Sequence, residues 1–309
     1  MWRYEDTRAG LRDALRLSSA MTYKSSVAGN RLGGGKGVIV LPVGAETPTG
    51  RERNAVLLDF AETVDALRGA YISAEDVGTS AKDMEVIARG TKHVSGLSRR
   101  RGGSGDPSPS TALGVQAAIE ASVERVFGSP SLKGRTVVLS GLGHVGMRLA
   151  TGLLKAGAKV LATDIDRSKR QAIMTAGGRW IAPDRALTTA ADVFAPCALG
   201  GVLTDETVDE LQVPIVAGAA NNQLGDDSVA GQLAMRGILW APDFVANAGG
   251  IINIDVELER RGYDPARARE RVRGIGDTLR RIYDIAESTS VTPLDAAMAL
   301  ARERLAAGA

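Results

Sequence analysis

One glycine pattern limits the folds open to this chain more than any other feature of its sequence. Gly141, Gly143 and Gly146 follow the apolar run 136–140 and open a helical run at Val145. In such a turn the first glycine permits the bend, the second lets a pyrophosphate approach the backbone, and the third lets helix and strand pack closely. The phosphates then lie at a helix N-terminus, where free N–H groups favour negative charge. The pattern predicts a dinucleotide-binding unit.

An acidic residue follows at the distance that such a unit requires. Asp164 ends the next apolar run, about 20 residues after Gly141, where a carboxylate holds the ribose hydroxyls. An acid at this place disfavours a 2′-phosphate, so NAD is preferred to NADP. His144 lies within the glycine pattern, and a surface position in the loop suits it better than a catalytic role. A tight turn without a ligand would explain the glycines, but not the strand, helix and acid together.

The chain beyond residue 130 alternates regularly between apolar strands and helical segments, which predicts a doubly wound parallel Rossmann sheet in an α/β protein. Strands are expected at 136–140 and 159–164 and near Val193, Ile215 and Ile238; helices are expected at 145–156 and 167–176. Two further helices, over roughly 265–287 and 293–305, close the chain.

The first hundred residues predict a smaller, mixed α/β unit. Helices are expected over 5–21, 49–67 and 81–89, the second with capping-box spacing at Thr49, and strands over 37–41 and 71–74. Residues 98–109 are rich in glycine, proline and serine and contain three adjacent arginines, which is typical of a linker or hinge loop. The chain is therefore expected to form two domains.

Composition excludes several classes of protein. Of the 309 residues 44% are hydrophobic and the formal net charge is +2, so a core can form and no strong field would attract nucleic acid or an anionic membrane. Cys197 is the one cysteine, which excludes an intramolecular disulfide and fits a reducing cytoplasm. No run approaches the roughly 18 apolar residues of a spanning helix. The residues after Met1 do not resemble a signal peptide.

Two lysines stand in unusual settings. Lys24 follows the first predicted helix, and Lys36 follows three glycines, which leave space for a ligand near the backbone. Lysine, unlike arginine, can serve as a general base when its surroundings lower its pKa. Asp76 follows the expected strand 71–74 and could reach the same cleft. From spacing alone, a surface lysine, a glycine turn and a helix cap explain these three residues equally well.

Longer strings carry a resemblance to one family. The strings are MTYK at 21–24, LGGGK at 32–36, AEDVGT at 74–79, SGDPSPSTA at 104–112, APCALGG at 195–201, GAANNQL at 218–224 and APDFVANAGGIIN at 241–253. With the glycine pattern, they resemble the Glu/Leu/Phe/Val amino-acid dehydrogenases, most closely the leucine and valine branch. The resemblance covers essentially the whole chain.

The resemblance implies oxidative deamination of an apolar L-amino acid to its 2-oxo acid, with reduction of NAD, release of ammonia and no metal. It implies that Lys36 is the base that activates water for attack on an imino acid, and that Asp76 assists proton transfer. Lys24 would hold the substrate carboxylate. The side-chain pocket would be lined by Ala74, Ile251 and Ile254. For the two isoleucines, ordinary core packing is the stronger alternative.

The same resemblance implies a cofactor site. Thr111 and Asn222 would position the nicotinamide carboxamide, and Asp164 would hold the adenine ribose. The full implied set is Thr111, Gly141, Gly143, His144, Val145, Gly146, Asp164, Ala219, Asn221, Asn222 and Asn247. We expect a substrate-binding and oligomerisation domain over 1–108 plus 285–309, and a Rossmann NAD-binding domain over 109–284. The family implies a homo-oligomer formed through the first domain, and the single cysteine is the reason to expect a cytoplasmic protein.

Several alternatives stay open. Members of the family carry an N-terminal segment that this chain is expected to lack before Met1, and a catalytically silent NAD-binding relative is therefore one reading. A 2-hydroxy-acid dehydrogenase would need a histidine acid/base, and the sequence offers only His93 and His144. The arginines at 99–101 and between 260 and 281 suggest nucleic-acid binding as a further alternative. Acidic residues alternate with the second group of arginines, which favours a solvent-exposed helix face instead.

Overall fold

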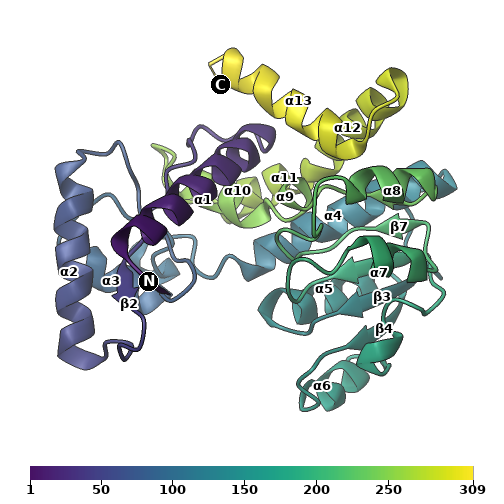
Figure 1. Ribbon diagram of the computed structural model, residues 1–309, viewed down its shortest axis with the longest axis horizontal. Helices are drawn as coiled ribbons and strands as arrows, with labels where there is room; N and C mark the ends of the chain where they lie inside the picture. Colours follow the sequence, from purple (N-terminus) through teal and green to yellow (C-terminus); the bar gives the residue numbers. More distant parts are fainter. Residues whose placement is uncertain (309) are drawn as a thin grey trace.

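A six-stranded parallel sheet forms the centre of the larger part of the molecule (Figure 1). The computed structural model describes residues 1–308. The strands lie in the order β5 (Arg179–Trp180), β4 (Lys159–Thr163), β3 (Thr136–Ser140), β6 (Val193–Pro196), β7 (Ile215–Val216) and β8 (Leu239–Trp240). The chain therefore proceeds outward from β3 in one direction and then returns to continue outward from β6 in the other. The doubly wound parallel sheet predicted from the sequence is confirmed.

Alternate residues of β3 build two separate cores. Val137 and Leu139 belong to a core with α4 (Ser108–Phe127), α5 (His144–Lys155) and the C-terminal helices, whereas Val138 packs with α7 (Asp205–Glu210) and α8 (Val229–Met235). Successive side chains of a strand point to opposite faces, so a strand covered on both sides is apolar throughout. This is the reason why the run 136–140 is uninterrupted. A short helix, α6 (Lys169–Thr175), follows β4.

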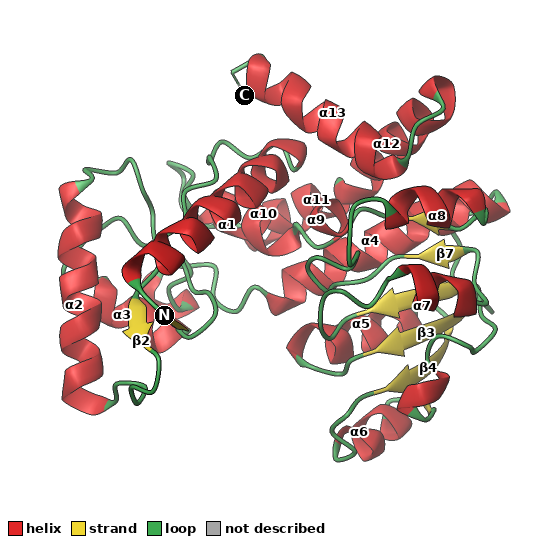
Figure 2. Cartoon of the chain, viewed as in Figure 1, coloured by secondary structure: helices red, strands yellow, loops and turns green. Residues whose placement is uncertain are grey.

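Helices are the main regular elements of the smaller part, joined by long loops (Figure 2). It contains α1 (Thr7–Val27), α2 (Gly50–Ala66), α3 (Ala81–Ile87) and a two-stranded parallel sheet of β1 (Trp2–Tyr4) and β2 (Val40–Pro42). Its own core is small and centres on Leu57, Ala61, Met84 and Ile87. This unit therefore depends on few buried side chains of its own.

Five helices follow the sheet and connect the two parts. They are α9 (Asp243–Ala246), α10 (Gly249–Glu257), α11 (Pro265–Arg273), α12 (Ile275–Thr289) and α13 (Pro293–Ala306). The end of α1 packs on α13, where Ser26 donates a hydrogen bond to the carbonyl of Ala301 at 2.7 Å. The first and the last helix of the chain thus pack against each other.

The structure corrects several sequence predictions outside the sheet. The expected helix 265–287 is two helices that meet at Gly274, and the first helix continues to Val27 because no breaker precedes Gly29. The expected strand 71–74 is a single bridge between Ser73 and Val94. The expected buried strand 37–41 is reduced to the half-buried β2, and Thr49 makes no side-chain capping bond to α2. The sequence prediction also missed α4, α9 and α10.

The predicted linker 98–109 is a folded loop. Residues Arg99–Arg101 form a 3₁₀ turn, the amide of Gly105 donates to the carbonyl of Leu97 at 3.0 Å, and α4 already begins at Ser108. Within residues 1–308, no helix combines the length and apolar character needed to cross a membrane. The same residues contain no cluster of His, Cys, Asp and Glu suited to a metal ion.

Candidate active site

The run of glycines before Lys36 lies directly on α1. A Cβ atom at Gly34 would be 2.1 Å from the Thr22 hydroxyl oxygen and 2.5 Å from the Ser18 carbonyl, and Ser18 donates a hydrogen bond to Gly34 at 2.8 Å. The sequence analysis predicted that the glycines leave space for a ligand. At Gly34 the space is instead taken by α1, which packs against the glycine backbone. Only glycine fits there, and the close packing brings Lys36 near Lys24, in the last turn of α1.

Lys36 forms an ion pair and hydrogen bond with Asp76. Burial raises the pKa of Asp76, but the positive charge and hydrogen bond of Lys36, with the backbone amide of Val77, hold it below the usual value. The amide of Val77 donates to Asp76 at 2.7 Å. The pair therefore consists of a carboxylate and a lysine whose side chains are 49% and 20% exposed.

Lys24, like Lys36, is partly buried. Burial lowers the pKa of Lys24 to about 8; the charge of Asp243 opposes this shift and that of Lys36 adds to it. Its ammonium donates to Asn247 Oδ1 at 2.6 Å. A lysine with this pKa remains largely protonated at neutral pH, so Lys24 offers a partly buried positive charge to an anion.

Asn247 joins Lys24 to the loop after β7. The amide nitrogen of Asn247 donates to Asn221 Oδ1 at 2.7 Å and to the carbonyl of Ala219 at 3.1 Å. Asn221 and Asn222 are exposed, whereas Asn247 is only 4% exposed. The buried side-chain amide of Asn247 therefore connects Lys24, predicted to bind the substrate carboxylate, with Asn221 and Ala219, predicted for the cofactor site.

Two residues that the sequence analysis missed hold that loop. Gln223 is fully buried; its amide nitrogen donates to Gly218 and Ala220 at 3.1 and 3.0 Å, and its side-chain oxygen accepts from Trp240. Asp243 accepts from the amide of Gln223 at 2.8 Å, and burial raises its pKa. Gln223 lies in the string 218–224, directly after Asn222, and Asp243 lies in the string 241–253, shortly before Asn247. Both strings had suggested the family.

The glycine pattern has the geometry expected of a phosphate-binding turn. Gly141 has φ +110°, and a Cβ on it would lie 2.7 Å from the amide nitrogen of Ala198. A Cβ on Gly146 would be 2.0 Å from the carbonyl of Gly141, whereas one on Gly143 would meet nothing within 4 Å. The turn thus leaves open space at Gly143 and the N-terminus of α5, with an exposed His144, beside it.

Asp164 ties the end of β4 to the same turn. One of its oxygens accepts from the amide of Leu142 at 2.6 Å and the other from the amide of Asp166 at 2.8 Å. A carboxylate has about four acceptor positions, so two remain for hydroxyl groups of a ligand. Val145, predicted for the cofactor site, is partly buried and packs on the main core.

Thr111 and two of the three predicted pocket residues, Ile251 and Ile254, lie at α10. A Cβ on Gly250 would lie 3.1 Å from the Thr111 hydroxyl oxygen, so the start of α10 rests on this part of α4. Ile251 and Ile254 are partly buried, and Ile251 also packs on the main core. Ala74 is partly buried two residues before Asp76. The contact of Ile251 with the core agrees with the alternative explanation given for it above.

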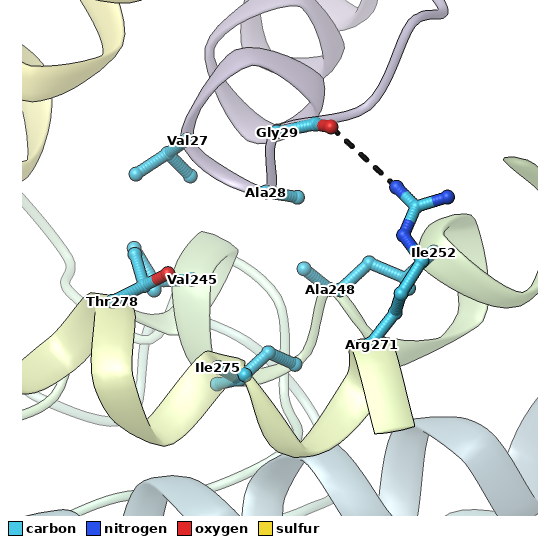
Figure 3. A pocket seen from close by; sticks show the side chains of 10 residues that line it. Val27, Ala28, Gly29, Val245, Ala248, Ile252, Arg271, Ile275 and Thr278 are labelled. Carbon is cyan, nitrogen blue, oxygen red and sulfur yellow. Dashed lines mark hydrogen bonds between the residues drawn. The ribbon is translucent and has the colours of Figure 1, made fainter. Parts of the chain in front are cut away.

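A cavity of about 160 Å³ lies beside this site rather than in it (Figure 3). Its lining comes from the end of α1, from α9 and α10, and from α11 and α12; the residues are Val27, Ala28, Gly29, Val245, Ala248, Ile252, Arg271, Gly274, Ile275 and Thr278. Arg271 crosses one end and pairs with the buried Asp255 at 2.6 Å. None of the predicted catalytic residues lines this cavity.

Cys197 lies next to the phosphate-binding turn. Its Cβ is 3.4 Å from the position of a Cβ on Gly146, and burial raises the pKa of its thiol to about 12. A thiol with this pKa remains protonated, so Cys197 is a packing residue in agreement with the sequence interpretation.

Comparison with known proteins covers nearly the whole chain. A family model described as Glutamate/Leucine/Phenylalanine/Valine dehydrogenase matches residues 102–168 and 163–308, and one described as Glu/Leu/Phe/Val dehydrogenase, dimerisation domain, matches residues 2–93. The prediction that the chain lacks the N-terminal segment of the family is not supported, because the model of that domain matches from residue 2.

Individual relatives are similar over the same length. The leucine dehydrogenase of Thermoactinomyces intermedius is 40% identical over 99% of this chain and 82% of its own length. The valine dehydrogenase of Streptomyces virginiae is 40% identical over 98% of this chain and 84% of its own length. The crystal structure of L-tryptophan dehydrogenase from Nostoc punctiforme superposes with a TM-score of 0.84 at 37% identity, covering 99% of this chain and 87% of that one.

Proposed function

The chain belongs to the Glu/Leu/Phe/Val dehydrogenase family, and we propose that it oxidatively deaminates a branched-chain L-amino acid with NAD as the cofactor. It is an amino-acid dehydrogenase that acts on apolar substrates at the CH–NH2 group. The observation that carries the proposal is the Lys36–Asp76 pair beside Lys24, joined through Asn247 to the loop of Asn221.

Lys24 would bind the substrate carboxylate. Its ammonium is partly buried and positive, and it donates a hydrogen bond to the oxygen of Asn247, so an incoming carboxylate finds both a charge and a fixed direction. Binding an anion favours the protonated form of Lys24, which strengthens the interaction. The carboxylate thus orients Cα of the substrate with respect to Lys36.

Lys36 and Asp76 would carry out the proton transfers. Loss of a hydride from Cα and a proton from nitrogen converts the amino acid to an imino acid. Asp76, a carboxylate, receives the proton that leaves the nitrogen. Lys36, once it has given its own proton to solvent, takes a proton from the water that adds to the C=N bond, and Asp76 returns the proton it received to the departing amine. Cleavage of the C–N bond then gives ammonia and the 2-oxo acid. The ion pair places both groups within reach of one another for this exchange.

The described residues fit a dinucleotide. The open space at Gly143, the N-terminus of α5 and the spare acceptor positions of Asp164 suit a pyrophosphate and a ribose. When bound, NAD would supply the acceptor for the hydride. Thr111 and Asn222 would orient its carboxamide, with Asn221, Asn247 and Ala219 nearby. An acid at position 164 favours NAD over NADP.

The substrate class rests on the apolar residues near the lysines. Ala74, Ile251 and Ile254 would form a wall that suits a branched aliphatic side chain. One methylene group changes discrimination by only about 1–3 kcal/mol, so valine, leucine and isoleucine should all be accepted. The named leucine, valine and tryptophan dehydrogenases among the relatives agree with an apolar substrate.

The smaller part carries an apolar surface that we assign to a homo-oligomer. Trp2, Leu11 and Leu15 are 57%, 58% and 64% exposed, and the two leucines lie one turn apart on α1. The matching family model describes this region as a dimerisation domain. A second copy of the chain would cover these side chains.

The test is NADH formation from L-leucine, L-valine, L-phenylalanine and L-glutamate, with the variant Lys36→Ala as a control. We expect turnover of the branched-chain substrates that depends on Lys36. NADH binding without turnover of any amino acid would instead identify a silent cofactor-binding subunit, a reading that the comparisons do not favour.

A further inference from the structure

Glu257 holds together the two ends of the loop between the parts of the molecule. It is the last residue of α10, and its carboxylate accepts hydrogen bonds from the amide of Gly96 at 3.0 and 3.1 Å and from the amide of Ser104 at 2.8 Å. The chain passes through residues 96–105, here called the connecting loop, on its way from the smaller part to α4. Glu257 therefore closes the neck of this loop.

The position of this carboxylate is not explained by α10 itself. An anion at the C-terminus of a helix is opposed by the helix dipole, so an external partner must hold it there. That partner is the pair of backbone amides, and no arginine or lysine forms a salt bridge with Glu257 in the described chain. The hydrogen bonds of a charged acceptor are among the stronger ones in proteins.

The connecting loop is compact enough to transmit the constraint. The amides of Gly103 and Gly105 donate to the carbonyls of Ser98 and Leu97 at 3.2 and 3.0 Å. A Cβ on Gly103 would lie 2.2 Å from the Leu97 carbonyl oxygen, so the two sides of the loop are in direct contact. A loop folded on itself in this way moves as a unit when its neck is held.

A second contact ties the loop to the same helix. The guanidinium of Arg99, at the tip of the loop, lies 5.9 Å from the centre of the Tyr263 ring. Tyr263 donates a hydrogen bond to Asn253 of α10 at 2.7 Å. The connecting loop is therefore tied to α10 in two ways, through Glu257 and through Arg99 and Tyr263.

The other end of α10 touches the proposed cofactor side. A Cβ on Gly249 would be 2.1 Å from the carbonyl of Ser110, and one on Gly250 would be 3.1 Å from the Thr111 hydroxyl. The helix contacts Thr111 near its start and ends at Glu257. Between these two points lie Ile251 and Ile254, which are proposed for the substrate pocket. With nine residues, α10 is about 13 Å long and links the three places rigidly.

We propose that Glu257 is a positioning residue that fixes the connecting loop on α10 and so sets how the Lys36 side of the cleft meets the nicotinamide side. This role rests on the proposed function, because it concerns the closure of the cleft over the amino acid. Glu257 touches neither substrate nor cofactor and acts through α10 and the loop. Loss of the Glu257 carboxylate should change the position of the Lys36 side relative to the nicotinamide side. The residues within each side should keep their arrangement.

The first experiment measures amide hydrogen exchange in the free protein. The variant Glu257→Gln keeps the shape but replaces one acceptor oxygen by an amide group, and Glu270→Gln on the surface of α11 makes the same change at an exposed position. We expect exchange in peptides covering 96–105 to become roughly tenfold faster in Glu257→Gln only. Unchanged exchange at Gly96 and Ser104 would overturn the proposal.

The second experiment measures kcat and KM separately for the amino acid and for NAD. A displaced connecting loop should raise KM for the amino acid, lowering kcat/KM roughly tenfold, and leave KM for NAD unchanged. A purely structural role would lower kcat through loss of active molecules and leave both KM values as in Glu270→Gln. That result would overturn the positioning role.

A further variant covers the case in which Glu257→Gln does not fold. Glu257→Asp keeps the charge but is one methylene shorter, so it cannot reach both amides, and the same two readouts apply. If both variants unfold while Glu270→Gln remains native, Glu257 is a folding determinant and the proposal is wrong. If the wild-type chain itself turns over no amino acid, the proposed function fails, whereas the exchange experiment still decides whether Glu257 holds the loop.

Discussion

The two parts of this molecule stabilise their functional residues in different ways. In the larger part, a parallel sheet covered on both faces fixes backbone positions: Gly141, Gly143 and Gly146 act through what their missing side chains permit. In the smaller part, strands of three residues and a small core support charged side chains, and Lys24, Lys36 and Asp76 act through their charges. Substitutions should therefore affect cofactor binding in the larger part, and substrate binding and proton transfer in the smaller part.

The largest expected effect is loss of chemistry without loss of cofactor binding. The variant Lys36→Ala removes the proposed base and should lower kcat by about 10²–10⁴-fold, the usual range for a general acid–base group. NADH binding, followed by fluorescence, should stay unchanged because the glycine turn lies in the other part. The exposed Lys92→Ala serves as the matched control. Equal activity in the two variants would contradict the division of tasks.

Two glycine substitutions should separate folding from binding within the larger part. Gly146→Ala places a Cβ 2.0 Å from a carbonyl oxygen and should lower the free energy of unfolding by about 1–3 kcal/mol, as overpacking does. Gly143→Ala meets nothing within 4 Å, so its Tm should match the wild type while NADH binds roughly tenfold more weakly. Calorimetry and NADH titration check both. A Gly143→Ala protein that binds NADH normally would place the phosphates elsewhere.

Titration of Lys24 gives an intermediate effect that belongs to the smaller part. Because burial lowers its pKa to about 8, Lys24 is positive below this pH and loses its charge above it. KM for the amino acid should therefore rise by up to about tenfold per pH unit above 8. In Lys24→Arg the side chain stays charged, so this rise should disappear even though the absolute KM is altered. A wild-type KM that is flat from pH 7 to about 10 would argue against carboxylate binding by Lys24.

The smallest expected effect concerns the N-caps of α2 and α3. Both helices begin after a Ser or Thr that is followed three residues later by an acidic residue. Ser80 forms a complete capping box with Asp83 at α3, whereas Thr49 makes no side-chain cap at α2. Ser80→Ala should therefore lower the free energy of unfolding by about 1 kcal/mol, and Thr49→Ala by a few tenths at most. Denaturant unfolding of both variants is the measurement. Similar losses would mean that Thr49 caps its helix in solution.

The accuracy of sequence prediction follows the same division. The strand at 136–140 was predicted with its true ends, because a strand buried on both faces is a continuous apolar run. The strand expected at 71–74 is a single bridge at Ser73, since its pairing depends on Val94 and on few buried neighbours. Gly274 also shows the limit of periodicity, because an apolar stripe continues across a break between two helices.

The sequence by itself determined the dinucleotide turn, the family and the identity of the residues proposed for catalysis, because each is carried by a short string of neighbouring residues. Only the tertiary structure decided how they meet. Lys24 binds Asn247, 223 residues away, and Glu257 binds the amide of Gly96, 161 residues away. Burial likewise sets the pKa of Lys24. No local pattern encodes such contacts, since they arise when distant segments pack together and exclude water.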